Sequence, residues 1–258
     1  MASVGVTNSA PLVIAATGGS GTRVVARIAR RAGYDLGANL NSAEDALDFY
    51  SFHDKWIDPF VKAERRGAAL PHGDLQRMKL EFHAALERHY PSSATETRWG
   101  WKAPRSIYLL PFLLTEFPQM KFIHVLRDGR DMALSANQVQ LRKHGGAILS
   151  WHERLLCSTA ERSVLLWNRV NMRAAEFGES KLRDNYLLVR FEDLCAKPLE
   201  TTAHIINFLN ARVDPEPIAK AEIFPPSTLK RWKTCSTAVL AKLERLGGDA
   251  LRKFGYLA

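Results

Sequence analysis

The sequence has little cysteine, no long apolar run and no dense cluster of basic residues. Its 258 residues include three cysteines, Cys157, Cys195 and Cys235, which are too few and too scattered for a disulfide framework or a cysteine metal site. We therefore expect free thiols in a reducing compartment. No stretch approaches the ~18 apolar residues that span a bilayer, and Met1–Ala10 lacks the charged flank and apolar core of a signal peptide. The protein is accordingly expected to be cytoplasmic, with no membrane partner.

The charge of the chain is basic without being gathered in a tail. The formal net charge is +9, from 36 Lys and Arg against 27 Asp and Glu, and such an excess suits an anionic ligand or acceptor. No run of five or more basic residues occurs, so a nucleic-acid partner is not expected. The length, without repeats or low-complexity segments, predicts a single domain over residues 1–258. Nothing in the sequence indicates the oligomeric state.

A glycine-rich turn lies between an apolar run and an amphipathic segment near the N-terminus. Leu12–Ala16 is apolar and β-branched, as in a buried parallel strand, and apolar residues recur at helical spacing from Arg23 to Arg31. The backbone N–H groups of such a turn and the dipole of the following helix together form a socket for a phosphate-like anion. The alternative is a tight strand-to-helix turn without a ligand, as occurs in any α/β protein.

Two further apolar runs, at Lys121–Leu126 and Tyr186–Phe191, are predicted to be strands. Helices are predicted to begin after Ser42, which would act as a cap, and after Arg127-Asp-Gly-Arg-Asp131. Further helices are predicted over Asp74–Tyr90, Ser106–Phe117 with Ser106 as its cap, Ile148–Phe177, Pro198–Leu209, Ala238–Leu246 and Asp249–Phe254, the last two being short. Pro91–Arg98 is predicted to be a polar loop. This alternation predicts an α/β fold: a three-layer, P-loop-like arrangement with a central, mostly parallel sheet flanked by helices. Ligands bind outside the carboxyl ends of the strands in such sheets, so the glycine-rich turn and the residues after Leu126 should be neighbours.

The turn matches neither of the two best-known nucleotide-binding motifs. The pattern G-x-x-x-x-G-K-[ST] requires a lysine, whereas Gly21 is followed by Thr22 and Arg23. The pattern G-x-G-x-x-G is also missing from this turn. A nucleotide kinase with a degenerate phosphate loop therefore stays an alternative of lower rank.

With these segments placed, most of the chain resembles the sulfotransferases that use 3′-phosphoadenosine 5′-phosphosulfate (PAPS). Gly18–Arg23 is similar to the 5′-phosphosulfate loop of the family. Gly19 departs from the family pattern, which usually has a lysine or arginine before the serine, while Arg23 matches the arginine of a second version of the loop. The departure at Gly19 keeps open a second hypothesis, a nucleotide-binding module of the same fold that has lost catalysis.

Four later segments extend the resemblance in the order of the family. Trp99–Arg105 is similar to its Trp-x-x-Lys-x-Pro segment, Phe122–Ser135 to the strand and helix of its 3′-phosphate site, Leu187–Leu194 to a structural strand that ends in Tyr-Glu-Asp-Leu, and Lys230–Lys233 to a late Gly-x-Trp-basic segment. The resemblance implies a contact from Lys102 to the sulfuryl group or the acceptor. It also implies that Arg127 and Ser135, eight residues apart, bind the 3′-phosphate.

The resemblance implies a complete set of site residues and no metal. The PAPS-binding residues would be Gly18, Gly19, Ser20, Gly21, Thr22, Arg23, Arg127, Ser135, Lys230 and Arg231. Arg23 and Lys102 would offset charge during transfer. The general base would be Glu44, Asp45, Asp48 or His53, with Asp48 and Glu44 ranked first, and the alternative for each is a helix cap or a solvated surface group.

The acceptor is not determined by the sequence. Aromatic residues from Phe49 to Phe60, interspersed with acids, would suit a sugar face or a phenol, or they form ordinary core. A small molecule or a glycan is expected.

Overall fold

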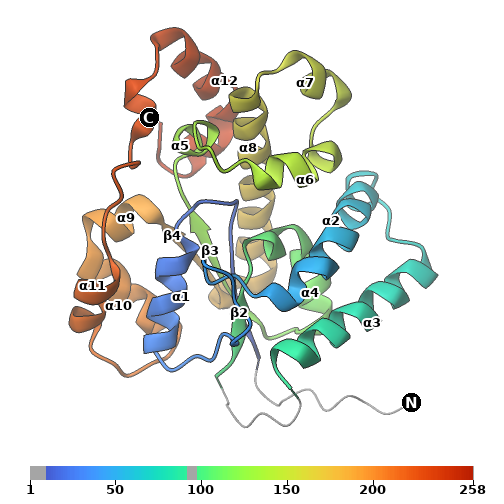
Figure 1. Cartoon of the computed structure of the whole chain (residues 1–258), viewed down its shortest axis with the longest axis vertical. Coiled ribbons are helices and arrows are strands. Elements are labelled where there is room, and N and C mark those ends of the chain that lie inside the picture. The colour runs from blue at the N-terminus through green and yellow to red at the C-terminus, as the bar shows by residue number, and fades with distance from the viewer. Residues whose placement is uncertain (1–9, 92–97, 258) are drawn as a thin grey trace.

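The computed structural model describes residues 10–91 and 98–257, and its centre is a four-stranded sheet in the order β2-β1-β3-β4. The strands are Leu12–Ala15 (β1), Gly100–Lys102 (β2), Lys121–Leu126 (β3) and Tyr186–Arg190 (β4). All three pairings between them are parallel, so their carboxyl ends lie along one edge. Helices cover both faces (Figure 1), which confirms the predicted three-layer α/β fold. Two predictions concern residues that lie largely outside the described ranges: the lack of a signal peptide in Met1–Ala10 and the polar loop Pro91–Arg98.

Alternate side chains of β1 face opposite sides of the sheet, which is the period-2 pattern of a strand buried on both faces. Val13 and Ala15 belong to one hydrophobic cluster, and Leu12 and Ile14 to another. The first cluster is completed mainly by α2 (Tyr50–Arg65), α3 (His72–His89), α4 (Leu110–Glu116), α6 (Val139–Ile148) and α8 (Thr159–Phe177). The second is completed by α1 (Thr22–Arg31), α9 (Phe191–Ala196), α10 (Pro198–Phe208) and α11 (Pro215–Glu222).

A third cluster lies beyond the end of β3. It joins Leu126 and Trp167 to residues of α5 (Gly129–Ala133) and α12 (Thr237–Lys253). All three clusters share the same central sheet, and a single domain over residues 1–258 stays a prediction. Within the described residues, no helix has the length and apolar character required to cross a bilayer.

The structure corrects two predictions about helix boundaries. The predicted continuous helix Ile148–Phe177 is divided into α7 (Trp151–Leu156) and α8, each of which begins with a reciprocal Ser and Glu capping box. The two predicted C-terminal helices form one helix, α12, which runs through Gly247 and Gly248. The glycine at 247 is accommodated because α12 packs closely there: a Cβ would lie 2.8 Å from Val164 Cγ2.

Two predicted caps do not cap helices. Ser42 lies in a loop that is instead organised by Asn41, whose Oδ1 accepts the N–H groups of Ala43 and Asp45 at 2.8 and 2.9 Å. The chain then forms a 3₁₀ turn at Leu47–Phe49 before α2 begins. Ser106 lies inside a 3₁₀ helix, Pro104–Leu109, that precedes α4, and its hydroxyl accepts the indole N–H of Trp101.

Strand β2 is a finding that the sequence did not predict. It has only three residues and no β-branched side chain, so it carries neither of the usual strand patterns. Gly100 lies so close to β1 that a Cβ would come within 2.0 Å of the Leu12 carbonyl oxygen. The lack of a side chain at Gly100 therefore allows β2 to pair with β1. This pairing places Lys102 at the edge of the sheet where the strands have their carboxyl ends.

Candidate active site

The carboxyl ends of all four strands lie at one cleft of about 550 Å³. The segments that line it follow each strand in turn: Gly18–Val24 after β1 except Ser20, Lys102–Arg105 around the end of β2, Arg127 after β3 and Phe191 after β4. This volume lies within the range of small-molecule sites. Among the described residues, five basic side chains line the cleft against a single carboxylate, that of Asp45: Arg23, Lys102, Arg105, Arg127 and Lys143. The cleft is therefore suited to an anionic ligand.

The glycine-rich loop has the backbone that the sequence predicted for an anion socket. Gly19 and Gly21 both have φ of 89°, a conformation that side-chain-bearing residues rarely adopt. Ser20 is fully buried and turns inward, because its hydroxyl donates to the Thr17 carbonyl at 2.7 Å. No acidic residue occupies the first turn of α1, so the positive end of its dipole is not neutralised there. Gly18, Gly19, Gly21, Thr22 and Arg23 line the cleft, whereas Ser20 braces the loop from behind.

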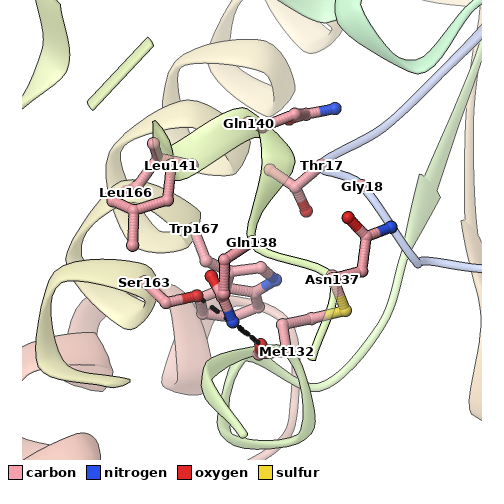
Figure 2. A pocket seen from close by; sticks show the side chains of 10 residues that line it. All are labelled: Thr17, Gly18, Met132, Asn137, Gln138, Gln140, Leu141, Ser163, Leu166 and Trp167. Carbon is pink, nitrogen blue, oxygen red and sulfur yellow. Dashed lines mark hydrogen bonds between the residues drawn. The ribbon is translucent and has the colours of Figure 1, made fainter. Parts of the chain in front are cut away.

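A second cavity, of about 20 Å³, lies behind this loop and has room for one water molecule. Figure 2 shows Thr17 and Gly18 on one side of it and Ser163 and Trp167 on the other. Gln140 on its wall connects the loop to the helical layer, since its Nε2 donates to the Ala16 carbonyl at 3.3 Å and its Oε1 accepts the Tyr108 hydroxyl at 2.9 Å. The loop is thus supported by a buried polar contact that sequence patterns did not indicate.

Lys102 is the most buried cation of the cleft, with 2% of its side chain exposed. Its Nζ donates to the carboxylate of Asp45 and to the carbonyl of Ala43. Burial lowers the pKa of Lys102, while the Asp45 carboxylate acts in the opposite direction. Asp45 also accepts the Tyr50 hydroxyl at 3.1 Å. The lysine is therefore a pre-positioned donor, held by one carboxylate and one backbone carbonyl of the loop that precedes α2.

The structure does not bring Glu44 or Asp48 into the cleft lining. Glu44 forms an ion pair with Arg27, 2.7 Å from its Nε, on the outer side of the loop. Asp48 is buried, where it accepts the Asn39 amide at 2.7 Å and contacts His89 at 3.3 Å. Both carboxylates thus have structural partners elsewhere.

The other two candidate bases, Asp45 and His53, do line the cleft. His53 is 3% exposed, and its Nε2 lies 3.4 Å from Ser106 Oγ. Its Nδ1 is buried and has no hydrogen-bond partner within the described residues. Burial, followed by the nearby Arg105 charge, holds the pKa of His53 well below 6.5, so its imidazole is neutral.

Arg127 is positioned in the cleft by Asp131 and the late segment of the chain. Its Nη2 donates to Asp131 at 3.1 Å and to the Thr228 carbonyl at 2.6 Å. Its Nε is buried without a partner among the residues described. An unpaired buried N–H is costly, and an anion in the cleft would supply the missing acceptor.

Asp131 fixes the segment Lys230–Lys233 beside Arg127. Its carboxylate accepts the backbone N–H of Lys230 at 2.7 Å and that of Trp232 at 3.1 Å. Burial and, secondarily, the charge of Arg127 lower the pKa of Arg231, while the Asp131 carboxylate acts in the opposite direction. The side chains of Ser135, Lys230 and Arg231 do not belong to the cleft lining.

Ser135 follows α5, and Gln138 holds the end of that helix. The Gln138 amide donates to the carbonyls of Met132 and Ser135 at 3.1 and 2.8 Å, and the Ser135 hydroxyl accepts the N–H of Asn137 at 3.2 Å. The predicted pair therefore lies on either side of α5, Arg127 before it and Ser135 after it, and only the arginine lines the cleft.

Several lining residues were not identified from the sequence. Phe224, 70% exposed, presents an aromatic ring to the cleft from a proline-rich stretch. Arg105 and Lys143 both donate to Asp54 at another part of the lining. Of the aromatic segment, Phe49, Phe52 and Trp56 form core. No group of His, Cys, Asp and Glu that could hold a metal ion is found in the described part of the chain.

Comparisons with known proteins agree with this architecture. A model of the sulfotransferase family matches residues 18–215, whereas a search of curated proteins finds no match. The structure of sulfotransferase STF9 from Mycobacterium avium is similar with a TM-score of 0.54 and 12% identity, covering 96% of this chain and 78% of that one. The sulfotransferase domain of the Synechococcus PCC 7002 olefin synthase is similar with a TM-score of 0.51 and 16% identity, covering 98% of both chains. At such identities the structures show the fold, and the family model, which spans most of the sequence, shows that this chain belongs to the sulfotransferase family.

Proposed function

We propose that the protein transfers the sulfuryl group of PAPS to a hydroxyl or amine of a small-molecule or glycan acceptor, without a metal. The observation that carries the proposal is the meeting of three elements in one cleft: the glycine-rich loop, Lys102 and Arg127. A cytoplasmic location also stays a prediction.

The loop after β1 suits the 5′-phosphosulfate. The positive φ of Gly19 and Gly21 and the uncompensated N-terminus of α1 favour a bound oxyanion. Gly19 stands where the family usually has a cation, and Arg23 lines the same part of the cleft. We assign to Arg23 the charge that Gly19 lacks, and to the N–H groups of Gly19 to Thr22 the phosphate contacts.

The region around Arg127 suits the 3′-phosphate. The buried Nε of Arg127 lacks an acceptor among the described residues, and Arg231 is held near enough for its pKa to be lowered by the Arg127 charge. A phosphate between the two guanidinium groups would accept charge-assisted hydrogen bonds from both. Ser135 and Lys230 stay predicted contacts that need a rotation of their side chains. Phe224 would offer a face for stacking of the adenine.

The proposed transfer is an in-line displacement at sulfur. The bond from sulfur to the bridging oxygen of the 5′-phosphate breaks with its electron pair left on the phosphate, and a bond from sulfur to the acceptor oxygen or nitrogen forms. Lys102 would leave Asp45 to stabilise charge on the transferring oxygens. His53 is our candidate base: with its Nε2–H directed at Ser106 Oγ, its Nδ1 carries a lone pair that would take the acceptor proton.

Calorimetric titration with adenosine 3′,5′-bisphosphate, with ATP and Mg²⁺ in parallel, tests the proposal. We expect tight binding of the bisphosphate, weak binding of ATP, and loss of bisphosphate binding in Arg127→Ala. The matched control is Arg252→Ala, which removes an exposed arginine paired with Asp249. A folded wild-type protein that does not bind the bisphosphate would contradict the proposal.

The titration, together with an assay of turnover with PAPS, also tests the two alternative functions, a nucleotide kinase and a binding module without catalysis. Preference for ATP with Mg²⁺ would favour a nucleotide kinase. A different result is that the protein binds the bisphosphate but forms none of it from PAPS with any of a broad panel of phenol, sugar and lipid acceptors. That result would favour a binding module that has lost catalysis.

A further inference from the structure

Helix α7 is a six-residue turn that packs none of its residues into the protein. Trp151, Leu155 and Leu156 are 58%, 70% and 80% exposed. Figure 1 shows α7 at one end of the molecule, joined by loops to α6 and α8. Three large apolar side chains on one exposed turn are unusual, since isolated exposed leucines are common but clusters mark interaction sites.

The turn is held in a fixed position. Capping boxes begin both α7 and α8, at Ser150 with Glu153 and at Ser158 with Glu161. Glu153 is also bound by both terminal nitrogens of Arg169, at 2.5 and 2.8 Å. The exposure of the apolar side chains is therefore built into the fold.

A basic groove of about 610 Å³ lies beside this turn, between α6 and the start of α8. Its charged lining consists of Arg142, Lys143, Arg154 and Arg162, and no carboxylate belongs to the lining within the described residues. The acids nearest in sequence have other partners: Glu153 binds Arg169, and Glu161 lies 3.5 Å from Lys242. The groove therefore keeps a net positive charge beside the apolar turn.

We propose that α7 and this groove dock the protein on an anionic lipid surface, with Trp151, Leu155 and Leu156 inserted among the lipids and the basic side chains on the headgroups. Tryptophan and leucine flanked by arginine and lysine are the composition of interfacial membrane segments. Basic residues near an anionic leaflet add to the attraction, and the cytoplasmic leaflet carries such lipids.

The shape of the surface favours lipid over a protein partner. Apolar side chains that are more than half exposed on a turn at the end of the molecule can insert directly into a bilayer, whereas a protein would need a matching cavity. Lys143 lines both the groove and the active-site cleft, so docking would place the cleft mouth close to the lipids. The expectation of no membrane partner rested on the lack of a spanning run, which concerns insertion across a bilayer and not adsorption to its surface.

Cosedimentation of the full chain with vesicles tests the docking surface independently of PAPS binding. We expect binding to vesicles of phosphatidylcholine mixed with phosphatidylglycerol, weaker binding to pure phosphatidylcholine, and a decrease with salt. The pair Leu155→Ser with Leu156→Ser, and the pair Arg142→Gln with Arg154→Gln, should each weaken binding about tenfold or more. None of these residues is buried, so thermal melting should confirm that the variants fold.

Matched controls are Leu80→Ser, which removes a leucine 71% exposed on α3, and Arg252→Gln on α12. Both should bind vesicles like the wild type. Failure of the wild-type protein to sediment with anionic vesicles would overturn the proposal, as would equal losses in Leu80→Ser. A different result would assign the surface to a contact between copies of the chain: no binding of the wild type to vesicles, together with self-association of the wild type that is lost in the Leu155→Ser, Leu156→Ser variant, as measured by sedimentation velocity.

Discussion

The backbone of Gly21 lies against the ring of Phe191 so closely that a Cβ on this glycine would come within 2.2 Å of the ring carbon Cδ2. The glycine ends the anion loop of β1, and the phenylalanine begins the helix after β4. One contact therefore joins the loop after β1 to the cleft wall after β4, although β3 lies between these two strands in the sheet.

We expect Gly21→Ala to destabilise the protein by about 3 kcal/mol, because it adds overpacking against Phe191 to the strain of a positive φ. The matched control is Gly33→Ala, with φ of 90° and no heavy atom within 4 Å of the new Cβ, which should cost about 1 kcal/mol of backbone strain. Urea unfolding measures both. Equal losses in the two variants would show that Phe191 yields and does not fix the loop.

Lys102→Met should separate transfer from binding. The substitution keeps the aliphatic stem and removes the charge that we assign to the transferring oxygens, so we expect turnover with PAPS to fall by about 100-fold or more. Binding of adenosine 3′,5′-bisphosphate, which lacks the sulfuryl group, should change little. The control is Lys55→Met on α2, which removes an exposed ion pair with Glu81 on α3 and should retain turnover. A parallel loss of bisphosphate affinity in Lys102→Met would contradict the assigned role.

His53→Gln should lower turnover by about 100-fold while bisphosphate binding is retained, because general-base catalysis contributes this much. Asp48→Asn is the comparison, since Asp48 is buried near His53 in sequence but does not line the cleft. The pH profile of turnover gives a second readout: the acid limb that belongs to His53 should disappear in His53→Gln. Loss of turnover in Asp48→Asn, in a variant of normal stability, would return the role to the carboxylate.

The stability of the protein should decrease as the pH falls from about 6.5 to about 4, partly through His124. This imidazole is fully buried, with Nε2 2.9 Å from Asn171 Oδ1 and Nδ1 3.0 Å from the Tyr186 hydroxyl. Burial lowers its pKa from 6.5 to about 4, so the unfolded chain takes up the proton first and is favoured as the pH falls.

Removal of this group should flatten the pH dependence. The difference in unfolding free energy between wild type and His124→Gln should shrink by about 2 kcal/mol between pH 7 and pH 5, measured with urea. His53 and His144, whose pKa values are also lowered by burial, are present in both proteins and cancel. His72→Gln, at an exposed position, is the comparison variant. An unchanged difference in the His124 pair would mean that the imidazole is protonated in the folded state.

The elements that could be predicted from the sequence are those whose pattern is local. β1, β3 and β4 are apolar runs, and Arg127 follows β3 at the edge where parallel strands bind ligands. The division between α7 and α8, which the prediction of one continuous helix missed, also has a local signal, since Ser150 and Ser158 each precede a glutamate by three residues.

The remaining features depend on contacts between distant segments. β2 exists because Gly100 fits against Leu12, and no local pattern indicates that fit. The sequence could not rank His53 above Asp48, because the two residues are only five positions apart at the start of α2. The contacts of Asp48 with Asn39 and with His89 on α3, which hold it outside the cleft lining, depend on the tertiary structure. Phe224 reaches the cleft from a proline-rich segment with no ligand pattern.

The exclusively parallel pairing of the sheet has a consequence for folding. Leu12 pairs with Gly100 and with Lys121, and Phe122 pairs with Tyr186, so every pairing joins segments far apart in the chain. Such contacts form slowly, because long loops must close before any pairing is rewarded. The cleft takes residues from all four strand ends and from the late segment at Thr228. A nascent chain therefore has no binding site until synthesis has passed that segment, and recovery of ligand binding during refolding reports completion of the whole sheet.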